Sequence, residues 1–206
     1  MKLKIFIIAL SLAFVSANAL TQALPTATES KPTGDAGIDY NLSDKGGEKH
    51  GVWIRVYAEG SLYYVGSFNS GKPEGQFLYF FETGELMSKI EHPSSSNSTA
   101  QISAIHYRKN SSVQSSGFYI STDDKEKQAR DGSWGFYDEG SKQVKQETYS
   151  AGLLNGPYWI KTKEGSLVEE GGFANGKLDG LKTTYYDTGT VRQRINYIAD
   201  VLEGDF

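Results

Sequence analysis

The chain has 206 residues, with 21 basic and 25 acidic side chains, a formal net charge of −4 and no cysteine. The acidic balance argues against nucleic acid or anionic lipid as a nonspecific partner, because both attract basic surfaces. The absence of cysteine excludes disulfides and cysteine-based metal sites, and we expect no cofactor.

The N-terminus has the three parts of a secretory signal peptide, predicted at residues 1–19. Lys2 and Lys4 supply the positive start, Ile5–Val15 is an apolar run, and Ala17–Ala19 is a small-residue cleavage site. The alternative, a transmembrane anchor, requires about 20 apolar residues, more than this run contains. We therefore expect cleavage after Ala19, a periplasmic or secreted protein, and no transmembrane anchor.

Residues 20–48 are rich in Thr, Ser, Pro, Gly and Asp and contain few large apolar side chains. This composition predicts either a disordered leader or a loosely held N-terminal cap. The remaining residues, 49–206, are predicted to form a single elongated repeat domain.

Glycines recur at a spacing of 24 residues, as in Gly51 and Gly75 or in Gly132, Gly156 and Gly180. A fixed period of this length is typical of an array of supersecondary units. A second glycine follows nine positions after the first, except that Gly140 comes one position early. The ten glycines of these two columns are predicted to be structural turn residues: Gly51, Gly60, Gly75, Gly84, Gly132, Gly140, Gly156, Gly165, Gly180 and Gly189.

Each repeat is predicted to be a β-hairpin. Aromatic and β-branched runs such as Val52–Tyr57 end at turn pairs such as Glu59-Gly60, where glycine adopts a positive φ without steric cost. A third column at Gly71, Gly152 and Gly176, with Asp200 in the last unit, predicts the return turn. The fold class is therefore all-β, a single-layer antiparallel sheet of consecutive hairpins whose aromatic columns align into ladders.

Two aromatic columns follow this register. The first has Lys182 in place of its aromatic in the last unit, and the second, at Phe68, Tyr149, Phe173 and Tyr197, has His92 in the second unit. Exposed rings on a flat sheet could stack on sugars, whereas buried rings would form the core of a one-layer sheet. The candidate binding aromatics are Trp53, Phe77, Trp134, Tyr158, Trp159, Tyr185 and Tyr186.

The units resemble the MORN-repeat variant found in many bacterial proteins. The stretches Phe68–Leu86 and Phe173–Val191 each contain the glycine, lysine and aromatic positions of that pattern. The resemblance covers about residues 49–92 and 131–206, and Lys182 and Asp200 depart from it. It implies a scaffold or interaction surface without a catalytic centre, and some bacterial members carry an antitoxin-like label.

Residues 93–130 break the register and are predicted to be an irregular insertion. Within them, Ile102–Tyr107 and Gly117–Ile120 are expected to be strands around a turn at residues 109–112, and residues 123–130 a charged loop or one helical turn. The 57 positions from Gly75 to Gly132 equal two periods plus nine residues, which suggests one degenerate hairpin with inserted loops. The segment is either a specificity element or a tolerated insertion.

Catalytic patterns are weak. Residues 171–178 and 66–73 nearly match a phosphate-binding loop, but the columns of the repeat produce both matches and no helix is expected to follow. His50, His92 and His106 share no metal-ligand spacing, and His92 is expected to pack in an aromatic column. Glu169 and Glu170 are adjacent strand positions and should face opposite ways, which does not suit a glycosidase pair. We therefore expect a non-enzymatic protein, with a hydrolase as the weaker alternative.

The favoured function is an exported scaffold that binds a protein partner through its sheet face or inserted loop. The alternatives are a cell-wall polysaccharide-binding module that uses exposed aromatics, and an antitoxin-like or immunity-like protein. Gly204–Phe206 resembles the opening of a further repeat, so the last strand edge is expected to be uncapped. An uncapped edge favours pairing with another chain, including a homo-dimer.

Overall fold

The computed structural model describes residues 40–94, 101–121 and 128–203, and these residues form strands and turns without any helix. The predicted signal peptide and the first part of the leader, up to residue 39, lie outside the described residues. The chain divides into two compact units, and residues 109–111 belong with the first. We call them the N-terminal unit and the C-terminal unit.

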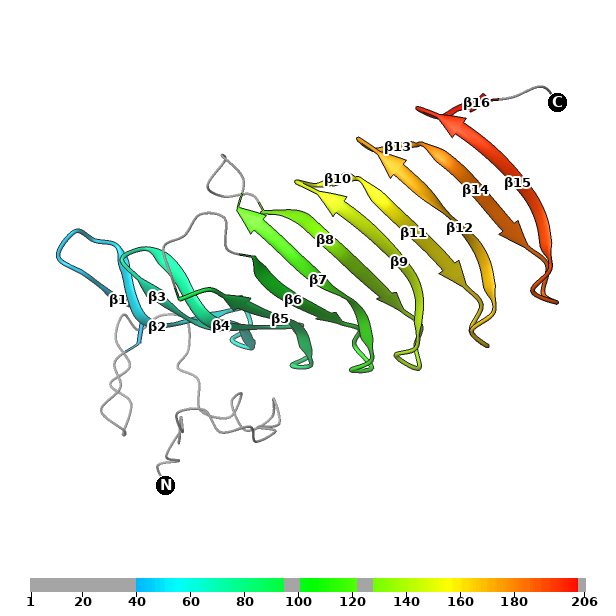
Figure 1. The fold of residues 1–206 in the computed structure, drawn as a ribbon. Coiled ribbons are helices and arrows are strands. Elements are labelled where there is room, and N and C mark those ends of the chain that lie inside the picture. The colour runs from blue at the N-terminus through cyan, green and yellow to red at the C-terminus, as the bar shows by residue number, and fades with distance from the viewer. Residues whose placement is uncertain (1–39, 95–100, 122–127, 204–206) are drawn as a thin grey trace. The chain divides into compact units, whose positions relative to one another are not determined.

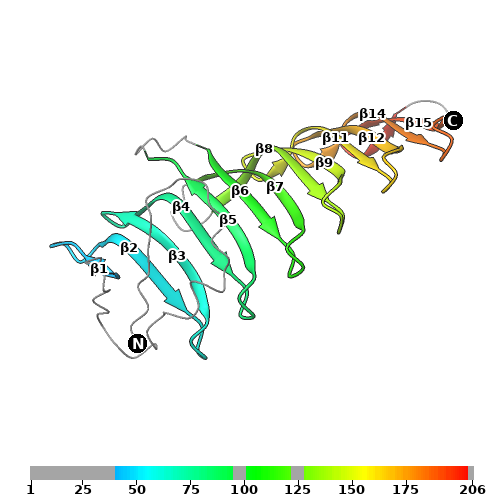
Figure 2. The same cartoon turned by 90° about the horizontal axis from the view of Figure 1, so that it is seen from below.

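The N-terminal unit is an antiparallel sheet whose strands are neighbours in sequence order (Figure 1). Its strands are β1 (Leu42–Ser43), β2 (Lys49–Val56), β3 (Leu62–Asn69), β4 (Lys72–Phe80) and β5 (Leu86–His92). In Figure 2, β2, β3, β4 and β5 lie side by side in one layer, as predicted for consecutive hairpins.

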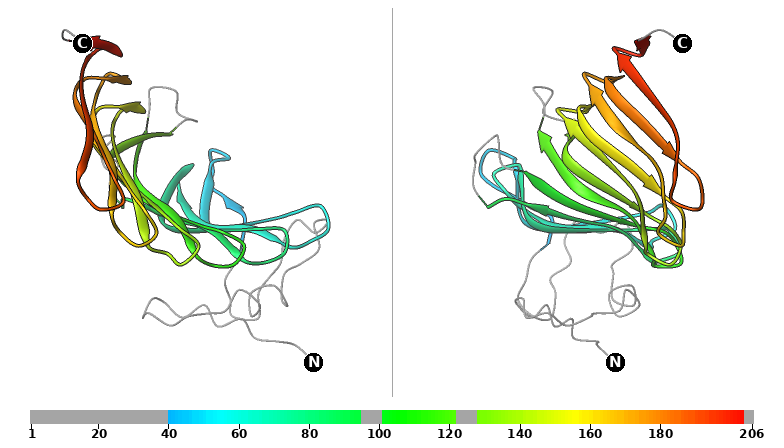
Figure 3. Two further views of the ribbon diagram at one scale, coloured as in Figure 1. Left: turned by 90° about the vertical axis from the view of Figure 1, so that its right-hand side faces the viewer. Right: turned by 45° about the vertical axis from the view of Figure 1, so that its right-hand side comes forward.

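The C-terminal unit follows the same rule, and its strands also lie in one layer in both views of Figure 3. The main path is β6 (Ile102–Tyr107), β7 (Val113–Ser121), β8 (Gln128–Tyr137), β9 (Gln143–Ser150), β11 (Gly156–Lys161), β12 (Leu167–Ala174), β14 (Gly180–Tyr185), β15 (Val191–Ile198) and β16 (Val201–Glu203). The two-residue strands β10 (Leu153–Leu154) and β13 (Lys177–Leu178) pair with β9 and β12. The predicted fold class is confirmed.

Four of the predicted turn glycines lie at hairpin reversals. Gly60, Gly84, Gly165 and Gly189 have φ values of +94°, +97°, +101° and +81°. Each donates its backbone N–H to the carbonyl three residues earlier, as Gly60 does to Tyr57 at 3.0 Å. Gly140 also lies in its hairpin turn, between β8 and β9, but the residue with positive φ in that turn is Ser141, at +61°. Ser141 lies nine positions after Gly132, so this repeat is not one residue short.

The first glycine column does not lie at turns, which corrects the prediction for five residues. Gly51, Gly75 and Gly132 lie inside strands, and Gly156 and Gly180 begin strands. Each is opposite a residue of the second aromatic column, as Gly51 is opposite Phe68 and Gly132 opposite Tyr149. Their φ values are all positive, between +68° and +122°. These positions therefore favour glycine, as predicted, but because of a strand irregularity and not because of a turn.

The third column forms the return turns and joins consecutive repeats. Two successive residues have positive φ in each turn, as type I′ geometry requires: Ser70-Gly71, Ala151-Gly152, Asn175-Gly176 and Ala199-Asp200. The second residue of each turn donates its N–H to the carbonyl two residues before the glycine that opens its repeat, at 2.7–2.9 Å. The acceptors are Lys49, Arg130, Leu154 and Leu178 respectively. Every return turn is therefore bound to the residues that lead into its own repeat.

A side chain adds a second bond at three of these turns. The residue before the first glycine of a repeat accepts the N–H of the residue that opens the next return turn. The bonds run from Ala151 to Asp131, from Asn175 to Asn155 and from Ala199 to Asp179, at 3.1–3.3 Å.

The segment 93–130 is more regular than predicted. Its two expected strands are present, and the second is longer, but they form an ordinary hairpin, β6–β7. Ile102 is opposite Tyr119, as Gly132 is opposite Tyr149, so Ile102 opens a full repeat. The openings at Gly75, Ile102 and Gly132 are 27 and 30 positions apart, so the nine extra residues fall on either side of one intact hairpin. Residues 128–130 belong to β8, and 122–127 lie outside the described residues.

Candidate interaction surfaces

Three of the seven candidate binding aromatics form the core. Trp134, Phe77 and Tyr158 are 0%, 2% and 6% exposed, so they cannot offer a surface to a sugar or a protein. Two of these rings lie directly on a glycine. An added Cβ would come within 2.3 Å of the Phe77 ring at Gly66 and within 2.5 Å of the Trp134 ring at Gly117. The glycines allow the rings to lie flat on the sheet, and this explains their burial.

The glycines beneath the rings were missed by sequence analysis, although a signal exists. Gly66, Gly117 and Gly171 all lie fifteen positions after the residue that opens their repeat. Gly171 has the same role beside Tyr158, whose ring would be 2.9 Å from an added Cβ. Gly66 and Gly171 were the first glycines of the two near-matches to a phosphate-binding loop, and their packing role explains those matches.

In the N-terminal unit the aromatic face is held together by ring contacts. The Phe77 ring lies 5.2 Å from Phe68 and 5.0 Å from His92, both edge to face. His92 is buried, as predicted, and burial lowers the pKa of its imidazole against an opposing effect of Glu91. Tyr64 and Tyr79 extend the cluster, with ring centroids 5.7 Å apart. The Lys49 ammonium group lies over the edge of this cluster, 4.6 Å and 4.7 Å from the Trp53 and Phe68 ring centroids. Ring contacts therefore dominate this face.

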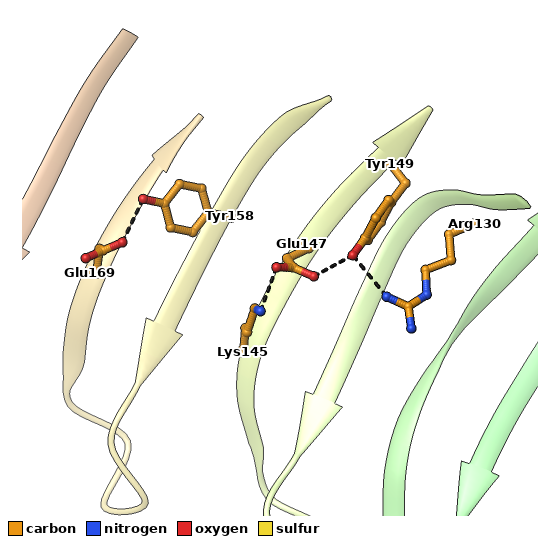
Figure 4. Close-up of polar contacts among 6 residues, drawn as sticks. All are labelled: Arg130, Lys145, Glu147, Tyr149, Tyr158 and Glu169. Atoms are coloured by element: carbon orange, nitrogen blue, oxygen red, sulfur yellow. Dashed lines mark hydrogen bonds and ion pairs between the residues drawn. The ribbon is translucent and has the colours of Figure 1, made fainter. Parts of the chain in front are cut away.

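In the C-terminal unit the corresponding face carries a charged network (Figure 4). Arg130 donates to the Tyr149 hydroxyl at 3.0 Å, and that hydroxyl donates to Glu147 at 2.6 Å. The other oxygen of Glu147 is 2.6 Å from the Lys145 ammonium group. The Arg130 guanidinium also lies 4.6 Å from the centroid of Trp134. Burial, followed by the bond to Glu147, raises the pKa of Tyr149.

A second polar chain continues across the next strands. The Tyr158 hydroxyl donates to Glu169 at 2.8 Å, and the other oxygen of Glu169 is 3.0 Å from Lys182 (the Tyr158–Glu169 bond is drawn in Figure 4). Lys182 is the residue that departs from the aromatic column, and its ammonium group pairs with Glu169. Burial and the bond to Glu169 raise the pKa of Tyr158. Every buried side-chain nitrogen and oxygen in the described part of the chain has a partner. These two polar networks therefore stabilise the fold from within.

The opposite face of the C-terminal unit exposes apolar side chains. Because side chains alternate along a strand, the neighbours of Tyr119, Tyr149, Lys182 and Tyr197 point away from the aromatic face. We call this side the reverse face, and it carries Phe118, Leu153, Leu181, Ile198 and Val201. All five are at least 40% exposed. In the described residues of the N-terminal unit no large hydrophobic side chain is exposed to this extent.

The remaining candidate aromatics retain some access to solvent. Trp53, Trp159 and Tyr185 are half-buried, and Tyr186 is 53% exposed. Trp159 lies opposite Glu170, which accepts the hydroxyl of Tyr185, and the Lys161 ammonium lies 4.4 Å from the Trp159 ring centroid. Glu169 and Glu170 thus have different partners on opposite faces, as predicted.

His50, His92 and His106 lie on β2, β5 and β6. Within 40–94, 101–121 and 128–203, no group of three or more His, Asp or Glu side chains is placed to hold a metal ion. No helix among these residues is long and apolar enough to cross a membrane.

Comparison with models of known protein families gave no match, and no curated protein matches the chain. The resemblance to MORN-type repeats therefore stays a prediction.

Proposed function

We propose that this chain is an exported, non-enzymatic scaffold that binds a protein partner through the reverse face of its C-terminal unit. The supporting observation is the uneven exposure of apolar side chains. All exposed large hydrophobic side chains in the described residues belong to the C-terminal unit, and five share one face. Exposed apolar groups that gather on one surface are typical of protein interaction sites.

The aromatic face is a poorer candidate surface. Its rings are packed on glycines or on each other, and its charged groups already bind one another. A partner would have to replace these internal bonds to gain its own, whereas on the reverse face it would cover apolar area at about 25 cal/mol per Å². The difference favours the reverse face.

The test is affinity capture from the cell-envelope fraction with three forms of the chain. In the first variant Phe118, Leu181 and Ile198 are replaced by Ser. The matched control replaces three exposed polar residues of the same unit, Glu139, Thr188 and Gln193, by Ser. We expect a specific protein to be retained by the native chain and by the control and lost from the apolar-to-Ser variant. Equal retention by all three forms, with circular dichroism showing that each is folded, would contradict the proposal.

A second candidate function is glycan binding around Trp159. Trp159 and Tyr185 flank Glu170 on the reverse face, and a half-exposed ring beside a carboxylate suits a sugar with its apolar face and hydroxyl groups. Titration with cell-wall glycan fragments should change the tryptophan fluorescence of the native chain but not that of Trp159→Phe. Trp53→Phe is the control, because Trp53 lies in the N-terminal unit. No change at millimolar glycan would remove this candidate.

A further inference from the structure

The two outermost strands of the described array end very differently. At the N-terminal side, residues 40–48 fold back over the outer edge of β2. A cap was one of the two alternatives predicted for residues 20–48. Tyr40 is buried, and Leu42 and Ser43 pair with His50 and Lys49. An edge that is covered in this way cannot accept another strand.

Asn41 completes the cap with both its backbone and its side chain. Its N–H donates to the carbonyl of Val52 at 2.9 Å, and its side-chain oxygen accepts the N–H of Ile54 at 2.8 Å. The indole of Trp53 donates to the carbonyl of Leu42 at 2.9 Å. Asn41 adopts a positive φ of +57°, a conformation that asparagine tolerates better than most residues. Beyond the pairing at Lys49 and His50, the cap thus also occupies the carbonyl of Val52 and the N–H of Ile54.

At the C-terminal side, β16 has no such cover among the described residues. It pairs with β15 on one side, and no described strand pairs with its other side. Val201, Leu202 and Ile198 are 68%, 45% and 52% exposed. Edge strands are normally protected by charge, proline or a bulge, and two of the three residues of β16 are aliphatic.

We propose that β16 pairs, in antiparallel orientation, with β16 of a second copy of this chain, which makes the protein a homo-dimer. A two-fold contact must be self-complementary, and this edge carries both signs of charge. Arg192 and Arg194 are exposed on β15, and Asp200 and Glu203 are exposed at β16 and the turn before it. A partner with one sign of charge would meet like charges, whereas a second copy supplies both.

The geometry of the pairing brings opposite charges level with each other. Pairing centred on Leu202 places Val201 of one copy opposite Glu203 of the other, and the reverse faces then join. In this register Arg194 on β15 is level with the turn at Ala199-Asp200 of the other copy. β15 of one copy and β16 of the other are about 10 Å apart, two strand spacings. This exceeds the Debye length of about 8 Å at physiological salt, so the attraction requires the long Arg194 side chain to reach toward Asp200 of the other copy. The Leu181, Ile198 and Val201 side chains of both copies then form one continuous patch.

The first test compares two lysine variants by sedimentation equilibrium of the purified full chain. Val201→Lys places a charge at the edge. Leu153→Lys is a matched control, because Leu153 also follows a return turn directly and is 55% exposed. We expect a reversible dimer for the native chain and for Leu153→Lys, and at least tenfold weaker association for Val201→Lys. A native chain that stays monomeric at about 100 μM, where even weak pairing would be visible, would overturn the inference.

The second test uses the absence of cysteine from the chain. In Leu202→Cys the only disulfide that can form joins two copies, and the pairing register places the two sulfur atoms opposite each other. Mild oxidation should therefore give a covalent dimer for Leu202→Cys and little for Leu153→Cys. Equal cross-linking of the two variants would contradict pairing at β16. A monomer that captures a different protein would overturn the dimer and leave the proposed scaffold function standing.

Discussion

The two units build the same backbone repeat and hold it together by different side-chain chemistry. In the N-terminal unit the aromatic face is a cluster of rings around Phe77. In the C-terminal unit the equivalent face combines rings with two ion pairs, at Glu147 and Glu169. The turns and the strand register are alike in both. The glycine spacing therefore determines the hairpin, whereas the side chains on the aromatic face differ between the units.

The two units also differ in the exposure of their large hydrophobic side chains. The N-terminal unit has no large hydrophobic side chain exposed among its described residues, and the C-terminal unit has nine. The unit whose aromatic face is held mainly by ring contacts thus exposes no large hydrophobic side chain among its described residues, whereas the unit with two ion pairs on that face does. This distribution is what favours the C-terminal unit as the interaction surface.

The largest effect is expected from removing the central ring of the C-terminal unit. Trp134→Ala should destabilise the fold by about 3–5 kcal/mol, because it leaves a cavity over Gly117 and removes the ring beneath Arg130. Denaturant unfolding followed by circular dichroism measures the change. Trp159→Ala, on the half-buried reverse face, is the control and should cost clearly less. Equal losses would mean that Trp134 is not the core of its unit.

A smaller loss of stability is expected in the N-terminal unit when the glycine beneath a buried ring is replaced. Gly66→Ala should destabilise by about 1–3 kcal/mol, because its Cβ would overlap the Phe77 ring, which is itself packed between Phe68 and His92. Gly140→Ala is the control, since Gly140 is exposed and has no positive φ. If both variants unfold at the same denaturant concentration as the native chain, the ring-on-glycine packing is not tight.

The ion pair at Glu147 can be removed by a substitution that keeps the shape of the side chain. Glu147→Gln removes the ion pair with Lys145 and the charge that Tyr149 donates to, and should cost about 1 kcal/mol, since Lys145 is partly solvated. The loss should shrink in 0.5 M salt. Glu91→Gln, at an exposed site in the N-terminal unit, should have no measurable effect. A salt-independent loss at Glu147 would point to packing instead of charge.

Acid should act on both units, and more strongly on the C-terminal one. Burial lowers the pKa of His92 and of His106, and at His106 the nearby Arg130 lowers it further. The neutral imidazole is favoured in the folded state, so its contribution to stability is present above pH 6.5 or so and is lost as the pH falls through the lowered pKa. Denaturant midpoints at pH 7.5 and 5.5 should differ less for His106→Phe than for the native chain. An unchanged difference would exclude His106 as a source.

The surroundings of His106 support this expectation. Its imidazole is stacked on Trp134 with centroids 6.0 Å apart, and its Nε2 lies 3.1 Å from the Tyr119 hydroxyl. Arg130 lies over the same indole, at 4.6 Å. A protonated imidazole would therefore share one ring with a second cation in a half-buried site, which is the physical reason for the acid sensitivity.

The smallest effect is a gain at a return turn. Ala199 adopts a φ of +50° where the preceding repeat has Asn175 at the same φ. Alanine in this left-handed conformation costs about 1–2 kcal/mol, and asparagine less. Ala199→Asn should therefore raise stability by about 0.5–1 kcal/mol, seen as a higher melting temperature, and Asn175→Ala should lower it by a similar amount. Two changes of the same sign would contradict this account.

The fold could be predicted well from the sequence because its signals are local. Glycine at a hairpin reversal is required by a positive φ at one residue, and the period of 24 repeats that requirement along the chain. The prediction failed where a residue other than glycine adopts such a φ. Ser141 and Ser111 have the positive φ values of their turns, +61° and +64°. For this reason the repeat that opens at Gly132 was predicted to be one residue short, and the segment that contains Ser111 was predicted to be irregular.

The candidate site was predicted less well, because burial depends on neighbours that are distant in the chain. Phe77 lies in β4 and Tyr186 directly follows β14, and both were candidate binding aromatics, yet Phe77 is 2% and Tyr186 53% exposed. The difference arises from what lies on the next strand, such as Gly66 beneath Phe77, and not from either residue's own sequence context. An aromatic column alone could not distinguish core from surface.

By itself the sequence determined the class of fold, the number of residues in a repeat and the places where most hairpins reverse, because steric limits on φ act on one residue at a time. Only the tertiary structure decided which rings are buried, which charges pair and which strand edge stays open. Those outcomes depend on cross-strand contacts between repeats, and a contact between residues tens of positions apart leaves no mark on the local pattern.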